Sequence, residues 1–135
     1  MKKWIVILLL LSYQSCSQEK QINLITNQYM IGLFDSLNTI QWDKWYDVKI
    51  EININFEENK AFFTNKAYTT LNITKFIGKD EINDNSENKT IISKYDAIDQ
   101  DSTYLYLQYR KWINSKDYQV YLIYDDFIIV YYTDH

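Results

Sequence analysis

The sequence predicts an all-β domain: an antiparallel meander of seven or eight strands that forms a small closed or half-open barrel. Three observations lead to this fold class. The chain has 13 tyrosines, 6 phenylalanines and 4 tryptophans and no proline, a composition that suits a pleated sheet. Several short segments alternate apolar and polar residues with the two-residue period of a strand. Polar turn sequences separate them at short intervals, and such a meander removes its exposed edges by curling.

The first half of the domain contains four predicted strands. The clearest is 48–56, Val-Lys-Ile-Glu-Ile-Asn-Ile-Asn-Phe, because all its apolar side chains point to one face. Residues 22–40 are less regular. The alternation of Tyr29, Ile31 and Leu33 favours a strand there, although one face of a helix would also fit the pattern. The other two segments with strand composition are 61–64 and 68–77.

The second half begins with a long polar segment and ends in a series of strands. Residues 79–89 include a single apolar side chain, so we expect a solvent-exposed loop. The turn sequence Asp96–Ser102 holds three carboxylates but lacks the glycine and final acid of a calcium loop, so we expect a hydrogen-bonded turn and no metal site. The four predicted strands are 90–98, 103–113, 118–124 and 127–133.

The N-terminal segment has the features of an export signal. Two lysines precede an apolar run at 4–11, which is too short to cross about 30 Å of hydrocarbon as a helix. The following sequence, Ser-Tyr-Gln-Ser-Cys16, resembles the signal of bacterial lipoproteins, in which the cysteine is lipidated and becomes the first residue. The resemblance implies a lipid anchor with palmitate-type chains on Cys16 and a place in the bacterial cell envelope, at the outer membrane.

This interpretation divides the chain into a signal peptide (1–15), a lipidated N-terminus with its tether (16–21) and one β domain (22–135). Removal of the signal takes away two lysines and no acid, which leaves 12 basic and 18 acidic residues and a formal charge of −6. Such a charge, without any run of basic residues, argues against nucleic acid as a partner. Cys16 is the only cysteine, so an internal disulfide is excluded.

A candidate binding surface follows from the C-terminal strands, which are rich in apolar and aromatic residues on both faces. Only one face can pack the core. The second face could bind a partner or line an aromatic cavity, because tyrosine combines a large contact area with a polar tip. The alternative is that the N-terminal part of the domain folds over this face as a second layer. The candidate surface residues are Trp42, Trp45, Tyr104, Tyr106, Trp112 and Tyr121.

These features lead first to an envelope-anchored lipoprotein that binds another protein as an accessory, inhibitor or immunity-type factor. One alternative is a binder of a small apolar ligand or sugar, since the predicted barrel is similar in outline to lipocalins and Trp42 and Trp45 flank acids as in sugar-binding surfaces. A second alternative is a hydrolase with two carboxylates. We expect no enzyme activity and no cofactor, because the only histidine, His135, is terminal.

Overall fold

In the computed structural model of the protein, the described residues are 20–64, 68–83, 89–113 and 117–133. The predicted signal peptide, the lipidation site Cys16, most of the tether and His135 lie outside these ranges. The first strand begins at Gln21, the last residue of the predicted tether. The strands are β1 (Gln21–Phe34), β2 (Ile40–Trp42), β3 (Tyr46–Asn55), β4 (Lys60–Thr64), β5 (Tyr68–Asn83), β6 (Lys89–Asp99), β7 (Tyr104–Trp112), β8 (Tyr118–Ile123) and β9 (Phe127–Tyr132).

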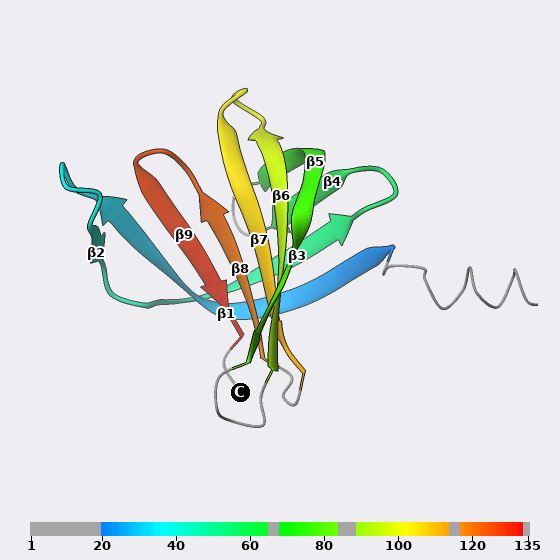
Figure 1. Ribbon diagram of the computed structural model, residues 1–135, viewed down its shortest axis with the longest axis horizontal. Coiled ribbons are helices and arrows are strands. Elements are labelled where there is room, and N and C mark those ends of the chain that lie inside the picture. The colour runs from blue at the N-terminus through cyan, green and yellow to red at the C-terminus, as the bar shows by residue number, and fades with distance from the viewer. Residues whose placement is uncertain (1–19, 65–67, 84–88, 114–116, 134–135) are drawn as a thin grey trace, which may run out of the picture.

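The strands form one antiparallel sheet that closes on itself. Its order is β2-β1-β3-β4-β5-β6-β7-β8-β9, and β9 also pairs with β1. Strands β1 and β3 to β9 therefore make a closed eight-stranded barrel, which confirms the predicted all-β meander. The extra strand β2 pairs with β1 beyond the end of β3, at the outer end of the long, curved β1 (Figure 1).

Every regular element among the described residues is a strand. That part of the chain accordingly contains no helix of the length and apolar character needed to cross a membrane.

A β-bulge in β1 changes which of its side chains face the barrel interior. Before the bulge the even-numbered residues, such as Leu24, are buried inside. The register with β3 shifts between Thr26 and Gln28. Beyond this point Tyr29 packs on the core, and Gly32 faces outward beside β2, under the indole of Trp42. The extra residue thus reverses the alternation, so that beyond the bulge odd-numbered residues such as Tyr29 face the interior and even-numbered residues face outward.

The barrel interior is filled by aliphatic and aromatic side chains from all eight barrel strands. Tyr95, Tyr109 and Tyr131 are 6 to 7 % exposed and pack among the aliphatic residues. The residues at the centre of the interior are at most 1 % exposed, and they are Ile52, Ile54, Ala61, Leu71, Ala97, Leu105, Leu107, Val120 and Leu122. Side chains with so little exposure leave no room for water beside them.

The prediction of a loop at 79–89 is wrong at both ends of this segment, which are parts of strands. Residues 79–83 continue β5 and Lys89 begins β6, so only 84–88, outside the described residues, separate the two strands. Backbone pairing with β6 holds this polar extension as a strand. Ion pairs from Lys94 to Asp80 at 2.5 Å and from Lys89 to Glu81 at 3.5 Å span the two strands.

Candidate functional site

The outer surface over β6, β7, β8, β9 and β1 carries most of the candidate binding residues. Residues directly opposite each other on neighbouring strands share one face of a sheet. One outer row consists of Lys94, Gln108, Tyr121, Val130 and Met30. The next row consists of Asp96, Tyr106, Ile123, Ile128 and Gly32. Val130 and Ile128 are 4 % and 6 % exposed although they face outward, so other residues cover this part of the surface.

The cover comes from Trp42 and Trp45, which stand over the outer side of β1 and β9. Together with Tyr121 they form the walls of an open groove of about 320 Å³. The indole of Trp45 lies 5.8 Å from the ring of Tyr132, centroid to centroid. The remaining lining residues are Met30, Asp43, Gln119 and Val130. The groove is therefore aromatic at its walls, apolar at its floor and polar at its rim.

Local contacts fix the segment that carries the two tryptophans. Trp42 pairs with Gly32, which has no side chain to displace the indole. The Asp43 carboxylate accepts hydrogen bonds from the Tyr46 hydroxyl at 2.6 Å and from the Lys44 backbone N–H at 2.8 Å. These bonds, that of Tyr46 first, lower the pKa of Asp43 below its usual range, and the same contact raises the pKa of Tyr46. The rim of the groove thus holds an ionised carboxylate at neutral pH.

A cation lies beside the Tyr121 wall of the groove. The guanidinium carbon of Arg110 is 4.0 Å from the centroid of the Tyr121 ring, which is cation–π geometry. The Tyr121 hydroxyl donates to Gln119 at 2.9 Å, so one face and the hydroxyl end of this side chain are held in place. The buried Nε of Arg110 has no hydrogen-bond acceptor among the described residues.

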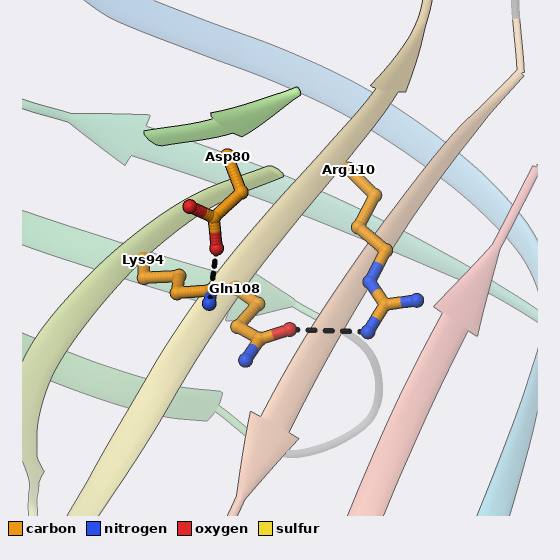
Figure 2. Close-up of polar contacts among 4 residues, drawn as sticks. All are labelled: Asp80, Lys94, Gln108 and Arg110. Atoms are coloured by element: carbon orange, nitrogen blue, oxygen red, sulfur yellow. Dashed lines mark hydrogen bonds and ion pairs between the residues drawn. The ribbon is translucent and has the colours of Figure 1, made fainter. Parts of the chain in front are cut away.

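Gln108 lies next to this cation, and the pair of Lys94 and Asp80 lies on the far side of Gln108 (Figure 2). Arg110 donates a hydrogen bond to Gln108 at 3.2 Å, and Lys94 pairs with Asp80. No acid among the described residues forms an ion pair with Arg110. Within the described residues, therefore, no ion pair neutralises the charge of Arg110.

Tyr104 and Tyr106 extend the aromatic surface along β7. Their rings meet edge to face at 5.7 Å, and they are 47 % and 45 % exposed. A hydrogen bond from the Tyr104 hydroxyl to Asp96 raises the pKa of Tyr104 to about 12. These two tyrosines are not covered by β2 or by the segment that follows it, so the second face of the C-terminal strands is only partly covered.

The structure thus divides the six candidate surface residues into three locations. Trp42, Trp45 and Tyr121 line the groove, and Tyr104 and Tyr106 form a pair on β7, of which Tyr104 lines a second cleft at the β6–β7 turn. Trp112 lies at the opposite end of β7, half-buried and opposite Thr90, and is not part of the groove.

Sequence reasoning missed Arg110, Met30, Gln119 and Val130. Arg110 shares the alternation of Tyr106 along β7, and Gln119 shares that of Tyr121 along β8, so that signal was present in the sequence. Val130 lies on β9, and only its pairing with Tyr121 and Met30 places it on this surface. The position of Met30 was hidden, because the bulge between Thr26 and Gln28 reverses the alternation of β1.

A second cleft, of about 670 Å³, lies where the β6–β7 and β8–β9 turns meet and includes four aspartates. Asp99 has a structural role there. Its carboxylate accepts the backbone N–H groups of Asp101 and Thr103 at 3.0 and 2.9 Å and the Tyr124 hydroxyl at 3.0 Å. The hydrogen-bonded turn predicted here is confirmed, and among the described residues no group of acids is arranged to hold a metal ion.

No protein-family model matches the chain, and searches among curated proteins and solved structures also find no match.

Proposed function

We propose that the protein is an envelope-anchored binding module that holds another protein at the outer groove and the adjoining tyrosine pair. The observation that supports this proposal most directly is that Trp42, Trp45 and Tyr121 line one open groove. Tryptophan, tyrosine and arginine are the residues that contribute most to binding at the centres of protein interfaces. Here all three types lie within one surface, and no acid of the described residues forms an ion pair with Arg110.

The dimensions of the groove support a side chain of a partner as the occupant. Its volume of about 320 Å³ is at the lower limit of small-molecule pockets. The exposed Tyr104 and Tyr106 continue the aromatic surface beyond the groove, as an extended interface requires. In contrast, the filled barrel interior offers no support for a ligand carried inside, as in the lipocalin-like alternative.

A sugar is the second candidate occupant of the same groove. Two indoles beside Asp43 and Gln119 combine stacking surfaces with hydrogen-bonding groups. The protein partner is favoured because Asp43 already accepts two hydrogen bonds within the chain and because the aromatic surface extends beyond the groove.

Anchoring by a lipid on Cys16 belongs to the same proposal and has its own test. The variant Cys16→Ser should leave the membrane fraction of the host and appear in the soluble fraction. If this variant remains in the membrane fraction as firmly as the parent protein, lipid attachment at Cys16 is excluded.

The binding proposal is tested by photocross-linking in the envelope of the host. A photoreactive phenylalanine derivative replaces Tyr106, which keeps the groove intact, and a control replaces Phe62, an exposed aromatic residue on β4. We expect a defined protein adduct from position 106 that is absent from position 62 and that is lost when Trp45→Ala is added. Equal adducts at both positions, or an adduct that persists in Trp45→Ala, would exclude the groove as the binding site.

A further inference from the structure

Asp43 is the one charged residue among the described residues that line the outer groove. The other lining residues are aromatic, aliphatic or neutral polar side chains. Among the described residues no cation forms an ion pair with Asp43. The side chain of the neighbouring Lys44 lies over the Tyr46 ring, with its amino nitrogen 5.5 Å from the ring centroid. The groove therefore presents a single negative charge, at its rim, to an occupant.

The two oxygens of the Asp43 carboxylate each make one hydrogen bond within the chain. Oδ1 accepts the Lys44 backbone N–H at 2.8 Å, and Oδ2 accepts the Tyr46 hydroxyl at 2.6 Å. An ionised carboxylate has about four acceptor positions, about two on each oxygen. One position on each oxygen therefore remains, and the two internal bonds fix the orientation of the group. A guanidinium, which presents two parallel N–H groups along one edge, matches such a pair of acceptors.

The indoles of Trp42 and Trp45 add flat surfaces on which a planar cation can stack. They belong to the same short segment as Asp43 and are 47 % and 41 % exposed. Cations are attracted to the faces of aromatic rings, most strongly to tryptophan, and arginine makes this contact more often than lysine. The guanidinium is also less strongly hydrated than an ammonium group, and it can stack and bond to a carboxylate at the same time. Together the indoles and the carboxylate favour arginine as the occupant.

We propose that the partner protein inserts an arginine side chain into the outer groove, where its guanidinium stacks on the indoles and bonds to Asp43. This inference rests on the proposed function and specifies the contact residue of the partner. Arg110 is the only arginine in the sequence, and it lies on the Tyr121 ring and outside the groove lining. The parts of the chain outside the described ranges therefore contain no arginine that could fill the groove. In a second copy of the chain, Arg110 is held against its own Tyr121, so the arginine comes from a different protein.

Two small probes of similar shape test the preference for a guanidinium. They are the N-acetyl amides of arginine and of citrulline, in which a neutral urea group replaces the guanidinium. Each probe is titrated into the full chain, and the indole N–H signals of Trp42 and Trp45 are followed by ¹⁵N NMR. We expect the arginine probe to shift both signals and to bind about tenfold more tightly than the citrulline probe. Equal affinities, tighter binding of the corresponding lysine probe, or no shift at either indole would overturn the inference.

Asp43→Asn and Asp35→Asn form a matched pair that tests the role of the carboxylate. Each variant removes one negative charge. Asparagine at position 43 keeps an oxygen for the Lys44 N–H and an amide group for the Tyr46 hydroxyl. Asp35 does not line the groove, and its Oδ1 accepts two backbone N–H groups of the β1–β2 turn, as an asparagine oxygen also can. We expect the affinity of the arginine probe to fall about tenfold in Asp43→Asn and by less than about twofold in Asp35→Asn. Equal affinities of Asp43→Asn and the parent would refute the ion pair.

The cross-linking experiment at position 106 separates this inference from the proposed function. An adduct that is lost in Trp45→Ala, together with equal binding of the two probes, would keep protein binding at the groove and exclude arginine as the contact residue. The absence of such an adduct would exclude the protein partner, and with it this inference. When the adduct forms, we expect a synthetic peptide with the cross-linked sequence to contain an arginine whose replacement by citrulline lowers the affinity about tenfold. A peptide without an arginine, or one that binds equally well with citrulline, would contradict the inference.

Discussion

The indole of Trp42 lies directly on Gly32, so closely that a Cβ atom at position 32 would stand 2.9 Å from two of its ring carbons. The same Cβ would approach a methyl group of Ile40 to 2.6 Å. Glycine at this position therefore leaves room for the side chains of Ile40 and Trp42 over β1 where β2 pairs with it, and lets Trp42 form one wall of the outer groove. Gly32 therefore affects the shape of the proposed binding surface through its contact with Trp42.

The variant Gly32→Ala should displace the indole of Trp42 and weaken partner binding. We expect affinity to fall about tenfold, while unfolding free energy falls by about 1–3 kcal/mol, the usual cost of overpacking. Tryptophan fluorescence and an affinity measurement check the two effects. The loss of unfolding free energy caused by Gly32→Ala should be smaller in a background that carries Ile40→Ala and Trp42→Ala, since these remove the clashing atoms. Unchanged fluorescence in Gly32→Ala would show that the contact does not control the groove.

Arg110→Lys should weaken binding without disturbing the fold. Lysine keeps the charge but lacks the planar guanidinium that lies on the Tyr121 ring at 4.0 Å. We expect a loss of about 0.5–1 kcal/mol in stability and a severalfold loss in affinity. Urea unfolding measures the loss of stability, and titration with the partner measures the loss of affinity. Lys94→Arg serves as a control, because arginine at this position keeps the ion pair with Asp80. Equal affinities for Arg110→Lys and the parent would remove Arg110 from the interface.

The pH dependence of Tyr104 follows from its hydrogen bond to Asp96. The bond raises the pKa of Tyr104 from 10.0 to about 12, so the folded protein keeps a proton that the unfolded chain releases in this range. The contribution to stability is present below pH 10 and is lost as the pH rises toward 12. Asp96→Asn should return the pKa toward 10. Titration of ¹³C-labelled tyrosine by NMR checks this, and identical Tyr104 curves in both proteins would contradict the assigned cause.

A matched pair of leucines tests the filled barrel interior. Leu107 is 0 % exposed at its centre, whereas Leu37 is 83 % exposed in the β1–β2 turn. We expect Leu107→Ala to reduce unfolding free energy by about 2–5 kcal/mol and Leu37→Ala by less than about 0.5 kcal/mol. Urea unfolding measures both. A small effect at Leu107 would mean that the interior contains space, which would revive the carrier alternative.

Most strands could be predicted because their alternation is local. The segment 48–56 shows this best, since its apolar side chains share one face and Ile50, Ile52 and Ile54 are indeed buried. The extension of β5 through residues 79–83 could not be predicted in the same way. Its side chains are polar, and pairing with β6 rather than burial makes it a strand.

The site was less predictable than the fold because it depends on long-range register. Trp42, Trp45 and Tyr121 were candidates from residue type alone, but the pairing of β9 with β1 brings them to one groove. Trp112 was a candidate because it is aromatic and lies on the same alternation as Tyr104 and Tyr106. It lies at the other end of β7, however, and therefore outside the groove. The cation–π contact of Arg110 likewise depends on which residues β7 and β8 place side by side.

The most direct test of protein binding at the outer groove is native mass spectrometry of the protein gently extracted from the envelope of its host. We expect the mass of a stoichiometric second polypeptide on the parent protein, and its loss in Trp45→Ala with the fold intact by circular dichroism. A monomer without a bound polypeptide, or a complex that survives in Trp45→Ala, would contradict the account.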